Sequence, residues 1–182
     1  MSGALRLAKR LGLPWIPGFP VTVRPFSEYF RGFERVEAVQ RIFGEKTGQV
    51  LKDLKVEFVR GGGYMGVNAL NGHLIVNPKY LNSGDKIDIY LDVIHELVHV
   101  RQFMEGKDLF DSRYRYVERP TEIEAYRHAV GEARRLGLGE DRICEYLRAE
   151  WLSDEDLRRL ASALGLSCGG AQESKGAKHR QK

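Results

Sequence analysis

Apolar and polar residues follow two different periods in the first half of the chain. From Ser27 to about Phe43 the apolar residues recur at helical spacing, which predicts an amphipathic helix capped by the serine. Between about residues 54 and 77 the period changes to two, with glycines 61–63 and the pair Asn71-Gly72 as turn signals. This pattern predicts an antiparallel meander of short strands that ends before the next helix.

A long helix that is apolar almost all round is predicted after these strands. Ser83 or Asp85 is expected to cap its beginning, and Gly106 is expected to end it. One stripe of this helix is polar and comprises Asp88, Asp92, His95, His99 and Gln102. Because most of its circumference is apolar, the helix is expected at the centre of the fold, with the polar stripe facing water, a cleft or a ligand.

Three further helices are predicted near residues 121–136, 141–151 and 154–164, the last capped by Ser153. The expected fold class is α+β, with a small antiparallel or mixed sheet packed on the central helix and further helices toward the C-terminus.

The length of 182 residues favours one domain, which is expected over residues 26–167. Residues 1–25 hold four of the six prolines and are expected to form an extended arm. Residues 168–182 are small, polar and basic, and are expected to be disordered. Lys175, Lys178, Arg180 and Lys182 in this tail supply most of the net charge of +4, and charges elsewhere alternate in sign, which argues against nucleic-acid binding.

The cysteines and the N-terminal residues bear on the cellular compartment. Cys144 and Cys168 are too few for a disulfide framework and do not form a C-x-x-C motif, as is typical of an intracellular protein. Proline interrupts the first apolar stretch before it reaches the length of a signal peptide or membrane span. The expectation is a cytoplasmic protein without a membrane span.

His95, Glu96 and His99 form the motif H-E-x-x-H within "LDVIHELVHVRQ". At 100° per residue, the two imidazoles lie about 40° apart on the helix surface and can share one metal ion. Glu96 lies about 60° from His99, at the side of the ion, where a general base for a metal-activated water must stand. The motif therefore predicts a Zn²⁺ site with Glu96 as the catalytic base.

Catalytic zinc normally takes three protein ligands, so one more is needed. The other histidines and downstream acidic residues that are candidates are Glu118, Glu122, Glu124, His128, His73 and His179. Thr121 is expected to cap the next helix with Glu124 as its capping-box partner, which leaves Glu122 on a face of small residues that can pack on the motif helix. His128 falls on the charged side, so Glu122 is the predicted third ligand.

The motif "HELVH", followed 23 residues later by the helical "ExEA" of residues 122–125, resembles the gluzincin metallopeptidases. The small size and the preceding strands are closest to the minigluzincins. The resemblance covers about residues 54–136 and implies a zinc peptidase with His95, His99 and Glu122 as ligands, in which an edge strand at residues 72–77 aligns the substrate. Tyr126 stands where the thermolysin-type pattern has an aspartate that orients a zinc histidine.

Several residues remain open as helpers of this site. Asp92, on the polar stripe, is either a partner of a zinc histidine or a solvated carboxylate. Tyr114, Tyr116, Arg119 and His73 are candidates for stabilising an oxyanion, with packing as the alternative for each tyrosine.

The function predicted from these residues is peptide-bond hydrolysis in a peptide or protein substrate. One alternative is a zincin-like module that binds partners without catalysis, because fold does not fix function. Another is a DNA-associated metallopeptidase resembling the SprT-like family, with His128 as the third ligand.

Overall fold

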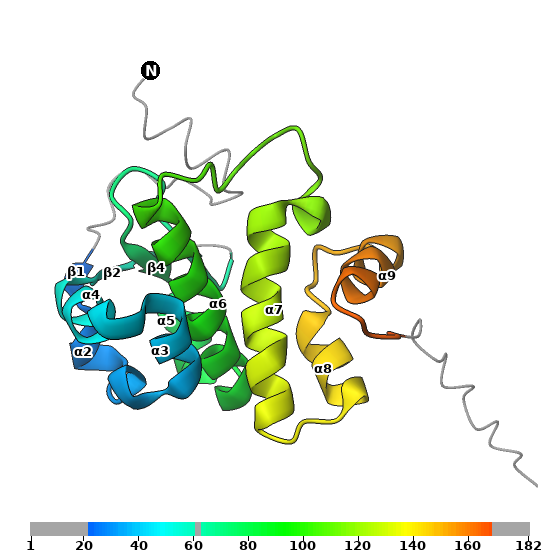
Figure 1. Ribbon diagram of the computed structural model, residues 1–182, viewed down its shortest axis with the longest axis horizontal. Coiled ribbons are helices and arrows are strands. Elements are labelled where there is room, and N and C mark those ends of the chain that lie inside the picture. The colour runs from blue at the N-terminus through cyan, green and yellow to red at the C-terminus, as the bar shows by residue number, and fades with distance from the viewer. Residues whose placement is uncertain (1–21, 61–62, 169–182) are drawn as a thin grey trace, which may run out of the picture.

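The computed structural model describes residues 22–60 and 63–168, which form an α+β arrangement of one small sheet and several helices (Figure 1). The strands are β1 (Thr22–Pro25), β2 (Lys55–Phe58), β3 (Met65–Val67) and β4 (Leu74–Val76). The α-helices are α2 (Phe26–Tyr29), α3 (Glu37–Phe43), α4 (Thr47–Asp53), α5 (Pro78–Ser83), α6 (Lys86–Met104), α7 (Pro120–Arg135), α8 (Glu140–Leu147) and α9 (Asp154–Ala163). Three 3-10 turns are η1 (Phe33–Arg35), η2 (Gly44–Lys46) and η3 (Tyr116–Glu118).

The sheet has the strand order β1-β2-β4-β3 and is mixed. β1 pairs antiparallel with β2, β2 pairs parallel with β4, and β3 pairs antiparallel with β4. The predicted antiparallel meander is therefore wrong for β2 and β4. The prediction of an edge strand at residues 72–77 is also wrong, because β4 lies inside the sheet with all three residues buried, and β3 forms the edge. A period of two identifies strands but does not determine which strands become neighbours.

The β3–β4 turn packs directly on the motif helix. Gly72 has a φ of +72°, and a Cβ atom at this position would lie 2.5 Å from the ring of Phe103. A glycine satisfies both the left-handed backbone and the close approach. The predicted turn at Asn71-Gly72 is thus confirmed, and it holds the hairpin against the C-terminal end of α6.

The N-terminal part of the described chain differs from its prediction. The expected single helix from Ser27 to Phe43 is divided into α2, η1 and α3: Gly32, with a φ of +86°, separates α2 from η1, and the extended backbone of Val36 separates η1 from α3. Residues 22–25, expected in the arm, form β1. Residues 1–21 and 169–182, the remainder of the expected arm and tail, lie outside the described residues.

α6 lies at the middle of the molecule, between the sheet with α2–α5 on one side and α7, α8 and α9 on the other (Figure 1). Asp85 is its N-cap, and the carboxylate accepts hydrogen bonds from the backbone N–H groups of Ile87 and Asp88 at 2.9 and 3.1 Å. The helix ends at Met104, just before Gly106 with its φ of +74°. Both predicted ends and the central position are confirmed.

Two hydrophobic clusters lie on the two sides of α6. The first joins α6 to the sheet and the N-terminal helices, through residues such as Val56, Leu74, Ile94 and Val98. The second joins Leu91 of α6 and one face of α7 to α8 and α9. Each fully buried leucine or isoleucine contributes roughly 2–3 kcal/mol, so both clusters hold α6 firmly. α7, α8 and α9 confirm the three predicted C-terminal helices, although α8 ends at Leu147 rather than near 151.

A disulfide bond joins Cys144 in α8 to Cys168 after α9. The two cysteines, too few for a disulfide framework, nevertheless form one bond, because the packing of α8 and α9 brings together residues 24 positions apart. Cys168 is buried in the second cluster, so it does not belong to the expected tail. Disulfides are typical of oxidising compartments, and the bond removes one of the two arguments for a cytoplasmic protein. None of the described helices is long and apolar enough to cross a membrane.

Candidate metal centre

Three buried side chains from α6 and α7 meet at one point. His95 and His99 lie one turn apart on α6, and Glu122 lies on the first turn of α7. The Nε2 atoms of the two histidines are 3.0 Å apart, and Glu122 Oε2 lies 3.3 and 3.4 Å from His95 Nε2 and His99 Nε2. The predicted ligand set is therefore assembled as a triangle of three donor atoms.

The chemistry and approximate size of this triangle fit a divalent metal ion such as zinc. Tetrahedral zinc with bonds of about 2.0–2.2 Å places its ligand atoms about 3.3–3.6 Å apart. Two imidazoles and one carboxylate are a ligand set of catalytic zinc. Glu122 Oε2 and His95 Nδ1 are moreover buried without a hydrogen-bond partner among the described residues. An ion bound to Glu122 Oε2 removes the unfavourable desolvation of that atom.

The electrostatics of the cluster also favour a cation. Burial raises the pKa of Glu96 to about 8. Burial alone would lower the pKa of His99, but the nearby negative charge of Glu122, together with that of Glu96, outweighs this effect and raises the pKa to about 9. Protonated His99 thus supplies a positive charge beside Glu122, and a divalent cation held by the cluster would take over that role.

Gln102 fixes the orientation of His99. Its side chain is fully buried, and its Nε2 donates hydrogen bonds to the backbone oxygen of Thr121 at 3.0 Å and to Glu124 Oε2 at 2.8 Å. The amide oxygen therefore accepts, and His99 Nδ1 donates to it at 2.7 Å. This leaves Nε2 of His99 directed at the cluster. The sequence places Gln102 on the polar stripe, but only the packing of α7 reveals this role.

Glu96 lies beside the triangle in a cleft of about 510 Å³. The cleft runs between β3 at the edge of the sheet and the segment before α7, and its lining includes Met65, Val67, Phe110 and both histidines. Glu96 Oε2 is buried and has no hydrogen-bond partner in the described part of the chain. When it is ionised, as a cation bound beside it would favour, the carboxylate is free to accept a proton from a water in the cleft.

The oxyanion candidates separate into two groups. Tyr116 and Arg119 line the cleft, and the Tyr116 hydroxyl lies 3.0 Å from that of Tyr126, whose ring packs against His95. Tyr114 is exposed and does not line the cleft. His73 does not line the cleft either, and its Nδ1 lies 2.7 Å from Glu57 Oε1.

The other third-ligand candidates have different partners. Glu124 binds Arg101 and Lys107, and His128 is half-buried on the same charged side of α7. The expected capping box is wrong, because α7 begins at Pro120 and Thr121 Oγ1 has no hydrogen-bond partner among the described residues. Glu124 is therefore excluded from the cluster by its ion pairs, not by a cap. His179 lies outside the described residues.

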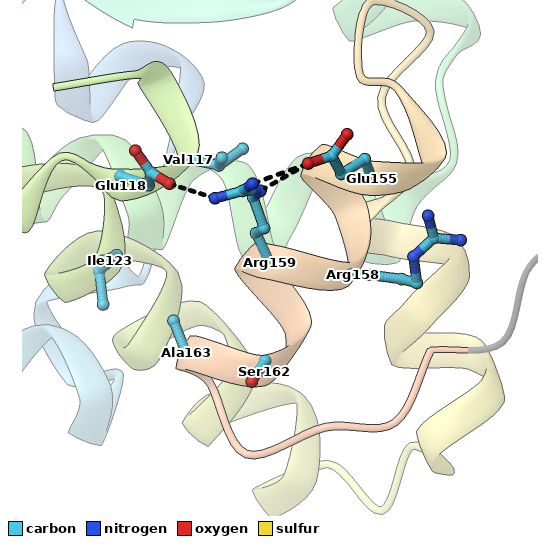
Figure 2. A pocket seen from close by; sticks show the side chains of 8 residues that line it. All are labelled: Val117, Glu118, Ile123, Glu155, Arg158, Arg159, Ser162 and Ala163. Atoms are coloured by element: carbon cyan, nitrogen blue, oxygen red, sulfur yellow. Dashed lines mark hydrogen bonds and ion pairs between the residues drawn. The ribbon is translucent and has the colours of Figure 1, made fainter.

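Glu118 lies in a second, shallow cavity of about 600 Å³ between η3, α7 and α9. Its carboxylate accepts a hydrogen bond from Arg159 at 2.8 Å, and Arg159 also binds Glu155 (Figure 2). The cavity contains none of the cluster residues. Glu118 is thus a surface ion-pair residue.

Asp92 is neither a partner of a metal-binding histidine nor a solvated carboxylate, the two roles predicted for it. Its carboxylate accepts a hydrogen bond of 2.6 Å from the hydroxyl of Tyr80, in a mostly buried position. His95 Nδ1 has no hydrogen-bond partner among the described residues, so Asp92 does not orient this histidine. Burial raises the pKa of Asp92 to about 6.

No known protein family matches the chain, and neither does any curated protein sequence or solved structure.

Proposed function

We propose that this protein is a zinc-dependent peptidase with a zincin-like fold, similar to the gluzincins and closest to the minigluzincins. The observation that carries the proposal is the convergence of His95, His99 and Glu122 at 3.0–3.4 Å, with Glu96 beside them in a cleft. A cluster with a purely structural role would not need Glu96, a second carboxylate without a hydrogen-bond partner on the side that faces the cleft.

His95, His99 and Glu122 hold the ion in this proposal. Zinc, when bound, polarises the scissile carbonyl and lowers the pKa of water. Glu96 accepts the proton of the attacking water at its carboxylate, and the same group then protonates the leaving amine. Tyr116 and Arg119 line the cleft and are the groups available to hold the carbonyl oxygen.

The alternatives receive less support from the residues around the site. The SprT-like alternative needs His128 as a ligand, but His128 lies on the other side of α7, near Arg101 and Glu124. A non-catalytic zincin-like module does not require an acceptor at the position of Glu96. A peptidase accounts for both Glu122 and Glu96.

The proposal is tested by incubating the zinc-loaded protein with a broad peptide library and identifying the products by mass spectrometry. Glu96→Gln is expected to keep one zinc per chain and to lower the cleavage rate by at least about 100-fold, because an amide cannot accept the proton. Glu105→Gln, at the exposed end of the same helix, is the matched control and should cleave as the parent does. Equal cleavage by the Glu96 variant and the parent would exclude the mechanism.

A further inference from the structure

An exposed tryptophan lines the mouth of the cleft. Trp151 lies in the connection between α8 and α9 and is 57% exposed. Of the large apolar side chains that are exposed in the described part of the chain, Trp151 is the one that belongs to the cleft lining. Exposed indole surface is unfavourable in water, and in a cleft it becomes favourable when a ligand covers it.

Trp151 contacts an aromatic residue that lies far from it in the sequence. Its ring contacts Tyr64, just before β3, with ring centroids 5.4 Å apart. Tyr64 also lines the cleft and packs on Tyr80 of α5 at 4.5 Å. The three rings form a row from α5 to the C-terminal helices. Trp151 is the lining residue that follows α7 in the sequence. Through this residue the C-terminal helices contribute to the wall of the cleft.

The row is anchored to the motif helix. Tyr80 donates a hydrogen bond of 2.6 Å to Asp92, which lies three residues before His95 on α6. The position of the aromatic rings is thus set relative to the metal ligands and does not depend on a loop alone. Such anchoring is typical of a binding surface that must be held at a defined place.

We propose that Trp151 and Tyr64 form a subsite that binds a large apolar or aromatic side chain of the peptide substrate. This inference rests on the proposed peptidase function and names its substrate class. The neighbouring lining residues Val59 and Met65 are also apolar. An aromatic side chain gains both burial and ring stacking against the indole.

The kinetic test uses blocked hexapeptides in which Phe, Leu, Lys or Gly replaces each position in turn. The parent should cleave the Phe and Leu peptides with kcat/KM at least about tenfold above the Gly peptides at one position. Trp151→Ala should lose this preference, with kcat/KM for the Phe and Leu peptides falling toward that for the Gly peptides, and Trp151→Phe should keep most of it. Leu136→Ala, which removes another exposed apolar side chain outside the cleft, is the control.

A binding measurement on a variant that does not cleave the peptide tests the subsite separately from the proposed peptidase function. In a Glu96→Gln, Trp15→Phe background, Trp151 is the single tryptophan of the chain, and its emission should move to shorter wavelength as Phe peptides bind. Such binding by a parent that cleaves nothing would refute the peptidase and retain the subsite. Cleavage that Trp151→Ala leaves unchanged would refute the subsite and retain the peptidase. A preference for Lys, or no spectral change at millimolar peptide, would also overturn the subsite.

Discussion

The Nδ1 atom of His99 lies 2.7 Å from the amide oxygen of Gln102, three residues farther along α6. The same amide group donates to the backbone oxygen of Thr121 at the start of α7. Glu122, the proposed third ligand, is the next residue after Thr121. A single buried side chain thus aligns one metal ligand on α6 with the segment that carries another.

Gln102→Leu should lower zinc affinity by about 10–100-fold, because the leucine keeps the buried volume but removes the acceptor that orients His99. The affinity can be measured by competition with a chromophoric chelator. Gln102→Glu retains an acceptor at the same place and should bind zinc more tightly than the leucine variant. Parent-like affinity in Gln102→Leu would show that the hydrogen bond does not position the ligand.

Three alanine variants of α7 distinguish the possible third ligands. Glu122→Ala should weaken zinc binding by orders of magnitude, since it removes a direct bond. Glu124→Ala removes partly exposed ion pairs to Arg101 and Lys107 and should cost about 1 kcal/mol of stability with a smaller effect on zinc. His128→Ala should retain the metal. If His128→Ala loses zinc and Glu122→Ala keeps it, the SprT-like alternative replaces the gluzincin-like proposal.

Removal of the disulfide should destabilise the C-terminal helices. Cys144 and Cys168 are 24 residues apart, and closing a loop of this length contributes about 3 kcal/mol in the chain-entropy description. The variant with both cysteines replaced by serine should melt on the order of 10 °C below the parent in a calorimetric scan. The variant itself should melt at the same temperature with and without reductant. A parent that is unaffected by reductant would contradict this prediction.

Asp92→Asn should stabilise the protein at neutral pH. Because burial raises the folded-state pKa of Asp92 to about 6, the folded protein holds this proton more tightly than the unfolded chain. Burying the ionised Asp92 therefore lowers the unfolding free energy of the parent. This loss is absent below the unfolded pKa near 4 and complete above about pH 6. The difference in unfolding free energy between variant and parent should grow by about 2 kcal/mol from pH 4.5 to 7.5. Denaturant titrations with a chelator present measure it, and a difference that does not change with pH would contradict it.

The motif helix could be predicted from the sequence because its determinants are local. The cap at Asp85, the stop at Gly106 and the spacing of His95 and His99 act within a few turns of one helix. Glu122 was also identified, through the small residues on its face of α7, although the argument from a capping box at Thr121 was wrong. Local signals thus sufficed for the residues of the candidate metal site.

Pairings between distant segments were decided only by the tertiary structure. The parallel pairing of β2 with β4 makes β3 the edge of the sheet, the α8–α9 packing joins Cys144 to Cys168, and Trp151 meets Tyr64 across the cleft. Gln102 could be placed on the polar stripe, but its partner Thr121 lies on another helix. Local periodicity sets which face of an element is apolar, whereas the choice of partner depends on which arrangement buries all of these faces at once.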